Sequence, residues 1–213
     1  INPRVNRRTD GYNGELEQRL RFLREVIAAI RAATDEHFII GLRISADERD
    51  PEGLTEDESL AAVQSLQPLL DYVHIVAGTS ASLGGAVHIV PPMAIEAAYL
   101  AKEAGTFKAG LSIPLFVTGR INQPQEAELI LARGQADVCG MTRALICDPQ
   151  MPNKTDDGRV EDVRACIACN QACIGHFHKG LPISCIQHPE TGRELLSLIH
   201  ISEPTRPLCI SYA

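Results

Sequence analysis

Four cysteines within twenty residues are the strongest chemical signal in the sequence. The spacing C-x2-C-x3-C-x11-C is formed by Cys166, Cys169, Cys173 and Cys185. Three close thiolates and one remote thiolate are typical of an iron–sulfur site with four cysteine ligands. Zinc sites more often use two well-separated pairs of ligands. A buried helix face would explain the first three cysteines but not Cys185. We therefore predict an iron–sulfur site, with zinc as the alternative.

Two arginines at predicted strand-to-helix turns are candidates for binding an anion. The turns are TGRIN (118–122) and MTRAL (141–145). Gly119 lets the main chain approach an anion closely, while Arg120 and Arg143 supply positive charge. In a (β/α)8 barrel, the loops after the last two strands commonly bind phosphate. The alternative is that both arginines are solvated surface residues.

Arg43 is unusual because it lies inside the apolar stretch IIGLRIS (39–45). A charged side chain on such a strand must reach water or meet an anionic or electron-rich partner. A structural ion pair is one such partner. The edge of a flavin ring that gathers negative charge on reduction is another.

Four strand-then-helix units position these residues. The strands are expected at 37–44, 71–78, 113–119 and 136–141, and the helices at 55–70, 91–108, 122–133 and from about residue 143. Thr55 and Glu58 form a capping-box pattern, Asn122 is suited to cap the third helix, and Gly134 is suited to end it. An amphipathic helix at 16–30 precedes the first strand.

This alternation predicts an α/β fold with parallel strands. An open doubly wound sheet and a (β/α)8 TIM barrel both fit the pattern. Four strands and a preceding helix correspond to the C-terminal half of a barrel of about 250 residues. We expect this half barrel to be followed by a Cys-rich, iron–sulfur-binding segment.

Composition argues against several classes of protein. The chain has 213 residues, a formal net charge of −7 and 45% hydrophobic residues. It has no apolar run of the roughly 20 residues that a membrane span needs and no basic stripe for nucleic acid. We therefore expect neither a membrane nor a nucleic-acid partner. Without a signal peptide, seven cysteines indicate a cytoplasmic protein with thiols or metal ligands.

Both ends of the sequence look interrupted. The chain starts at Ile1 in a polar, turn-rich segment, so we expect further sequence upstream. LSLIHISEPTR (196–206), followed by ISYA at the end, resembles the translation of a transposase adapter used in short-read sequencing. We interpret residues 196–213, with His200 and Cys209, as an adapter-derived artefact and exclude them from functional reasoning.

The motifs together resemble a known family. The pattern N-x-R-x-D-x-Y runs from Asn6 to Tyr12, and CIACNQAC (166–173) is followed by Cys185. They resemble the old yellow enzyme-like NADH:flavin oxidoreductase family, in its 2,4-dienoyl-CoA reductase and trimethylamine dehydrogenase branch. The resemblance covers residues 1–195. It implies an FMN-binding barrel with a 4Fe-4S cluster, and FAD and NAD(P)H in a further C-terminal region.

The resemblance also assigns roles to individual residues. Arg43 matches an arginine that approaches the flavin N1/O2 edge, and the FMN phosphate loops match Gly119, Arg120, Thr142 and Arg143. The cluster ligands match Cys166, Cys169, Cys173 and Cys185. Ser82 stands near the position of the family's catalytic histidine, and His88 is the candidate that could replace it. A structural loop histidine is the alternative for His88.

We therefore expect three regions: a partial FMN-binding TIM barrel at 1–150 (strands 5–8), a 4Fe-4S segment at 151–195 and the artefact at 196–213. The expected function is that of a fragment of an FMN- and 4Fe-4S-dependent oxidoreductase. Its small-molecule substrate would be an enoyl or dienoyl thioester or an N-methylated amine. Half a barrel leaves strand edges open, so the fragment alone is expected to be inactive. The alternatives are a non-catalytic zinc-binding module and a phosphate-sugar enzyme on a similar barrel. The sequence leaves the oligomeric state open.

Overall fold

The computed structural model describes residues 1–196, which fall into two compact units. The first unit contains residues 1–121 and 125–141, and the second contains residues 122–124 and the described residues from 142 onward. The predicted adapter-derived stretch, apart from Leu196, lies outside the described residues. The functional boundary expected at 150/151 stays a prediction.

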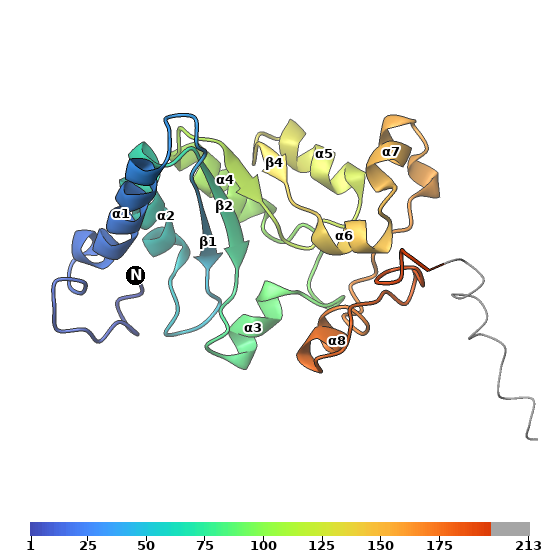
Figure 1. Cartoon of the computed structure of the whole chain (residues 1–213), viewed down its shortest axis with the longest axis horizontal. Helices are drawn as coiled ribbons and strands as arrows, with labels where there is room; N and C mark the ends of the chain where they lie inside the picture. The colour runs from blue at the N-terminus through green and yellow to red at the C-terminus, as the bar shows by residue number, and fades with distance from the viewer. Residues whose placement is uncertain (197–213) are drawn as a thin grey trace, which may run out of the picture. The chain divides into compact units, whose positions relative to one another are not determined.

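A four-stranded parallel sheet in the order β1-β2-β3-β4 forms the centre of the first unit (Figure 1). The strands are β1 (Gly41–Asp47), β2 (Tyr72–Ala77), β3 (Leu115–Val117) and β4 (Val138–Cys139). Consecutive strands are parallel neighbours, so each connection returns the chain to the same end of the sheet, as the alternating sequence pattern predicts. The parallel sheet is therefore confirmed.

Helices cover one face of this sheet. They are α1 (Leu16–Ala33), α2 (Glu56–Leu66), α4 (Ala101–Gly110) and α5 (Pro124–Ala132). Figure 1 shows α1 and α2 beside β1 and β2. Val73, Ile75 and Ala77 alternate along β2 and join the buried core with apolar residues of these helices. Because side chains alternate across a strand, the residues between them lie on the other face. His74 is one of these.

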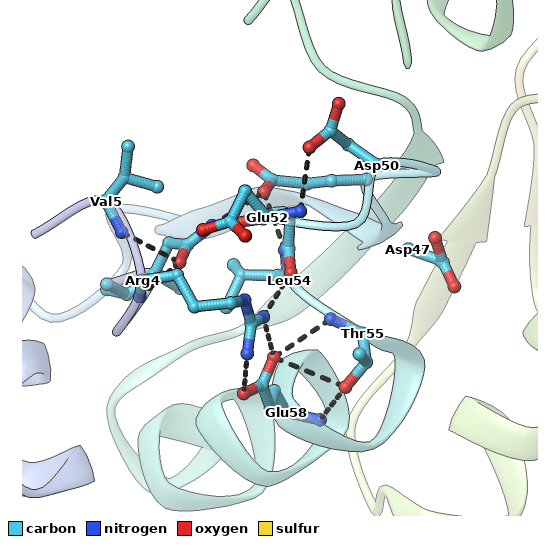
Figure 2. A network of polar contacts seen from close by, with 12 residues as sticks. Arg4, Val5, Asp47, Asp50, Glu52, Leu54, Thr55 and Glu58 are labelled. Carbon is cyan, nitrogen blue, oxygen red and sulfur yellow. Dashed lines mark hydrogen bonds and ion pairs between the residues drawn. The ribbon is translucent and has the colours of Figure 1, made fainter. Parts of the chain in front are cut away.

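Helix α2 begins with the predicted capping box. The Glu58 amide donates to the Thr55 hydroxyl at 3.4 Å, and the Thr55 amide donates to the Glu58 carboxylate at 3.0 Å. Figure 2 shows the Arg4 guanidinium binding the same carboxylate, at 2.9 and 2.5 Å. This hydrogen-bonded ion pair lowers the pKa of Glu58 from 4.5 to about 2. It ties the N-terminal segment to the start of α2.

The first strand differs from its prediction at both ends. It was expected at 37–44, but β1 starts at Gly41 and continues to Asp47. Its only strand neighbour in the described structure, β2, starts at Tyr72, which pairs with Gly41. Residues before Gly41 thus have no ladder partner. The Asp71 carboxylate instead accepts the Ile40 amide at 2.7 Å.

The helix predicted at 91–108 is also wrong in its first half. The chain forms a short helix α3 (Leu83–Ile89), then turns, and α4 starts only at Ala101. The prolines at 91 and 92 account for the end of α3, since the residue before a proline disfavours the helical conformation. Ala98 adopts a left-handed φ of 52°, and its amide donates to the Arg120 carbonyl at 3.0 Å. This contact, distant in sequence, stabilises the turn.

The remaining helices match the sequence pattern more closely. Helix α5 starts at Pro124, two residues after the predicted cap Asn122, and ends before Gly134, whose φ is 64°. The short helix expected from about residue 143 is α6 (Thr142–Cys147). A 3-10 turn, η1 (Gln67–Leu69), follows α2, where the sequence has a proline.

The second unit is built from short elements. They are α6, α7 (Met151–Asp156), the 3-10 turn η2 (Val160–Asp162) and α8 (Ile174–His178). Buried Asp148 links α7 to the segment after η2, because it binds the Lys154 ammonium at 2.6 Å and accepts the Arg164 amide at 2.9 Å. Among residues 1–196, no helix is both long and apolar enough to cross a lipid bilayer.

Candidate functional site

The four cysteines singled out by spacing line one small cavity in the second unit. The cavity is bounded on one side by α6 and on the other by the loops around Cys166, Cys169, Cys173 and Cys185. The six cysteines of the described chain are free thiols. Burial raises the pKa of the Cys166 thiol, while the Ala168 amide, which donates to its Sγ at 3.4 Å, opposes that shift. Backbone amides directed at sulfur are typical of iron–sulfur sites, where they tune the cluster.

Two residues with left-handed backbone shape the first cysteine loop. Ala168 has a φ of 55° and Asn170 a φ of 58°. The Asn170 carbonyl accepts the Gly175 amide at 2.9 Å. A Cβ on Gly175 would lie 2.8 Å from that carbonyl oxygen, so only glycine fits there. The loop is therefore held in a specific curve around the cavity.

Arg143 lies at this cavity. Its Nη1 donates to the Asn170 Oδ1 at 2.7 Å, and both residues line the cavity with the cysteines. The positive charge of Arg143 also acts to lower the pKa of Cys166, against the larger effect of burial. Thr142, the other residue expected at the FMN phosphate, is exposed at the start of α6. The phosphate role of both residues stays a prediction.

A fifth cysteine, which sequence reasoning missed, lies beside the four. Cys147 is 1% exposed at the end of α6, and its Sγ accepts the Gln187 amide at 3.5 Å. Burial, the charge of Cys185 and a hydrogen bond with Cys185 raise the pKa of Cys147 to about 12. It therefore stays a neutral thiol. Cys147 and Cys185 are brought together by the fold. The spacing of the cysteines in the sequence therefore does not reveal that Cys147 lies beside the other four.

The donor set at the cavity fits an iron–sulfur cluster in its chemistry. Four thiols share one cavity, and a backbone amide and a guanidinium face it. Thiolates, amide hydrogen bonds and positive charge are the groups that hold and tune such clusters. Within residues 1–196, no group of three or more His, Cys, Asp or Glu side chains is placed closely enough to hold a metal ion. The identity of any metal at the cysteines stays a prediction.

The turn after β3 has two features that fit a phosphate group. Gly119 is buried, and a Cβ there would lie 3.0 Å from the Tyr99 ring and 3.1 Å from Leu100. Arg120 follows with a left-handed φ of 51°. Its Nε is buried and has no hydrogen-bond partner in the described structure. A buried guanidinium nitrogen without an acceptor is costly unless a ligand oxygen binds it.

Arg43 lies on the face of the sheet opposite the helices. It is exposed, pairs in register with His74 of β2, and lines an open cavity of about 720 Å³. Arg8, Arg19 and Tyr12 also line this cavity, together with apolar residues. The charged group of Arg43, although on an apolar strand, is therefore exposed at an open cavity. Its contact with a flavin stays a prediction.

His74 is a second residue that sequence reasoning did not select. Its Nε2 lies 2.7 Å from the Thr118 hydroxyl, immediately before the Gly119 turn. Burial, and then the positive charge of Arg43, lower the pKa of His74. The ring is therefore neutral at pH 7. His74 and Thr118 link the β2 strand to the turn that precedes Arg120.

His88 lies on α3, which follows β2, and Ser82 is the N-cap of that helix. The Ser82 hydroxyl accepts the Gly85 amide at 3.1 Å and caps the helix. The His88 Nδ1 is buried without a hydrogen-bond partner in the described structure, and its ring lies 5.9 Å from that of Tyr99. Burial, and then the charge of Arg49, lower the pKa of His88. The catalytic role of His88 stays a prediction.

Comparisons with known proteins give a consistent result. A family profile described as "NADH:flavin oxidoreductase / NADH oxidase family" matches residues 1–162. A "Metal reductase" of Desulforamulus reducens is 37% identical over 99% of this chain and 31% of its own length. An "N,N-dimethylglycine/sarcosine dehydrogenase" of Chromohalobacter salexigens is 35% identical over 95% of this chain and 29% of its own length. The chain thus spans about a third of the length of these curated relatives.

Solved structures agree with the sequence relatives. A 2-naphthoyl-CoA reductase in complex with 2-naphthoyl-CoA superposes with a TM-score of 0.82 and 30% identity, over 89% of this chain and 29% of that one. Structural neighbours of this kind are TIM-barrel flavoenzymes, and the four strands form part of such a barrel. The sequence-based choice of a partial (β/α)8 barrel over an open sheet is therefore confirmed.

Proposed function

The chain belongs to the NADH:flavin oxidoreductase / NADH oxidase family, and we propose that it is the FMN- and 4Fe-4S-binding part of an oxidoreductase. The observation that carries the cluster proposal is the single cavity lined by Cys166, Cys169, Cys173 and Cys185. The family and the buried, unpaired Arg120 Nε support the FMN proposal. The proposal includes a cytoplasmic location, which the free thiols support.

Residues of this chain would hold and tune both groups. Gly119 and Arg120 would bind the FMN phosphate, with Thr142 and Arg143, and Arg43 would place positive charge near the flavin ring. When bound, FMN supplies hydride and electron transfer, and the cluster supplies one-electron transfer. His74, held neutral beside Arg43, adds no second positive charge on this face of the sheet.

The substrate is proposed from the relatives. One is named for N,N-dimethylglycine and sarcosine, and another for 2-naphthoyl-CoA. We accordingly propose an N-methylated amine or an unsaturated thioester as the small-molecule substrate. His88, whose lowered pKa keeps it neutral at pH 7, would accept a proton from the substrate. FAD and NAD(P)H would bind outside the described residues. Because the chain spans about a third of its relatives, the chain alone is expected to show no turnover.

FMN binding tests the flavin half of the proposal. Titrating the purified chain with FMN and following flavin fluorescence gives the dissociation constant. Replacing Arg120 with Gln removes the guanidinium whose Nε is buried without a partner in the described structure, and should weaken binding roughly 10- to 100-fold. Arg133→Gln, which changes an exposed arginine just past α5, is the matched control and should leave binding unchanged. Equal FMN affinity in the Arg120 variant and the wild type would count against the phosphate site.

Anaerobic reconstitution with ferrous iron and sulfide tests the cluster half. The wild-type chain should become brown, with broad visible absorbance. Cys185→Ala should lose most of that absorbance, and Cys139→Ala, which removes a thiol in the other unit, should retain it. A colourless chain that binds one zinc ion would favour the zinc-binding module. A wild-type chain that binds neither FMN nor iron would favour the phosphate-sugar enzyme.

A further inference from the structure

Arg143 contacts the cysteine loop directly. Its guanidinium hydrogen-bonds Asn170, which lies between Cys169 and Cys173 in the sequence. Both residues line the cavity of the four cysteines. The position differs from a solvated surface arginine, because the side chain is partly buried and donates to the Asn170 carboxamide oxygen at 2.7 Å. Arg143 therefore has a structural connection to the sulfurs that its expected phosphate role does not explain.

The contact is made to a rigid partner. Asn170 has a left-handed φ of 58°, and its carbonyl accepts the Gly175 amide at 2.9 Å. A Cβ on Gly175 would lie 2.8 Å from that carbonyl oxygen, so the loop packs closely against the start of α8. A guanidinium held by such a partner keeps its charge at one place. The carboxamide thus fixes where the positive charge lies relative to Cys166 and Cys173.

The charge matters because a cluster on four thiolates carries net negative charge. Adding one electron increases that negative charge by one and breaks no bond to sulfur. A fixed positive charge nearby stabilises the reduced state more than the oxidised one, and it does so strongly where burial excludes water.

We propose that Arg143, held by Asn170, is a positioning residue of the cysteine site that raises the reduction potential of the bound cluster and helps retain it. The inference rests on the proposed function, since it requires a cluster at the four cysteines. It extends that function, because it gives one side chain a role at the cluster as well as at the phosphate. Arg143 does not act as a cluster ligand.

The test compares variants of the chain reconstituted anaerobically with iron and sulfide. The potential of the cluster is measured by redox titration with a chemical reductant and followed by electron paramagnetic resonance. Flavin-loaded and flavin-stripped samples are both titrated, so that a change in FMN binding is separated from an effect on the cluster. Arg143→Gln should shift the potential to a more negative value in both samples. Arg143→Lys, which keeps the charge, should lie close to the wild type.

Asn170→Ala provides an independent arm, because it keeps the guanidinium but removes its partner. It should shift the potential in the same direction by a smaller amount and speed iron loss to a chelator by roughly 10-fold. The matched control is Arg159→Gln, which removes an exposed arginine paired with Asp157 and should match the wild type.

Each outcome decides a separate question. If the wild-type chain forms no cluster, the proposed function fails. If the wild type forms a cluster but Arg143→Gln has the wild-type potential, only this inference is overturned. It is also overturned if Arg143→Lys shifts as far as Arg143→Gln, because charge would then not be the cause. If Arg143→Gln retains too little iron to titrate, an unchanged potential in Asn170→Ala overturns it.

Discussion

Replacing Glu58 by Gln removes the charge that Arg4 binds at the start of α2 but keeps a side chain of the same shape. The pKa of Glu58 is lowered from 4.5 to about 2, chiefly by its hydrogen bond to Arg4. A lowering of about 2.5 units corresponds to at most ~3.4 kcal/mol. The side chains of Arg4 and Glu58 are 30% and 29% exposed. Solvent screening therefore reduces the ion pair's contribution to the free energy of unfolding to about 1 kcal/mol.

The dependence on pH follows from the direction of the shift. A carboxyl with a lowered pKa in the folded state contributes its stability above the unfolded value of 4.5 and loses it as the pH falls toward 2. Urea unfolding followed by circular dichroism should therefore show wild type more stable than Glu58→Gln at pH 7. The difference should shrink between pH 4.5 and pH 3. Asp57→Asn, which neutralises the neighbouring carboxylate in the same first turn, is the matched control. A difference that is equal at pH 7 and pH 3, or equal to that of Asp57→Asn, would refute the ion-pair reasoning.

Three further predictions concern the core and the titrating groups. Phe107→Ala should cost about 3–5 kcal/mol in urea unfolding, because Phe107 is fully buried, whereas Phe22→Ala, at a side chain that is 63% exposed, should cost far less. At pH 8.5 the native chain should alkylate Cys147 at least roughly 100-fold more slowly than the urea-unfolded chain, because its pKa is raised to about 12; equal rates in mass spectrometry would contradict this. In an NMR titration, Arg43→Gln should raise the pKa of His74 toward its ordinary value, since the Arg43 charge helps lower it; an unmoved or falling pKa would contradict the pairing of these residues.

Local sequence pattern predicted most of the fold. The strands at 71–78 and 113–119 appeared close to the expected places, because short apolar runs suit strands covered by helices. The capping box at Thr55 and Glu58 formed as its residue types require. These features depend on neighbours in the chain, which a single sequence displays directly.

Features that depend on distant contacts were predicted poorly. The helix expected at 91–108 fails where the Ala98 amide bonds the Arg120 carbonyl, a partner that lies on another turn. The strand expected at 37–44 starts late because its neighbour begins at Tyr72. In both cases the deciding hydrogen bond joins segments that local periodicity cannot relate.

The candidate site shows the same division. Spacing gathered four cysteines into one predicted site, and these four line one cavity. Cys147 was not predicted as part of the site, because only the tertiary fold places it next to Cys185. Arg143 was singled out for its place after a strand, but its bond to Asn170 could not be foreseen from that place. Residue types predicted the chemistry, and tertiary packing decided which side chains meet.

The most direct test of the central claim is the iron and acid-labile sulfide content of the anaerobically reconstituted chain. A cluster held by Cys166, Cys169, Cys173 and Cys185 predicts about four iron atoms and about four sulfides per chain, and a large loss of both in Cys185→Ala. A chain that binds one zinc ion, or that binds iron equally well without Cys185, would contradict the account.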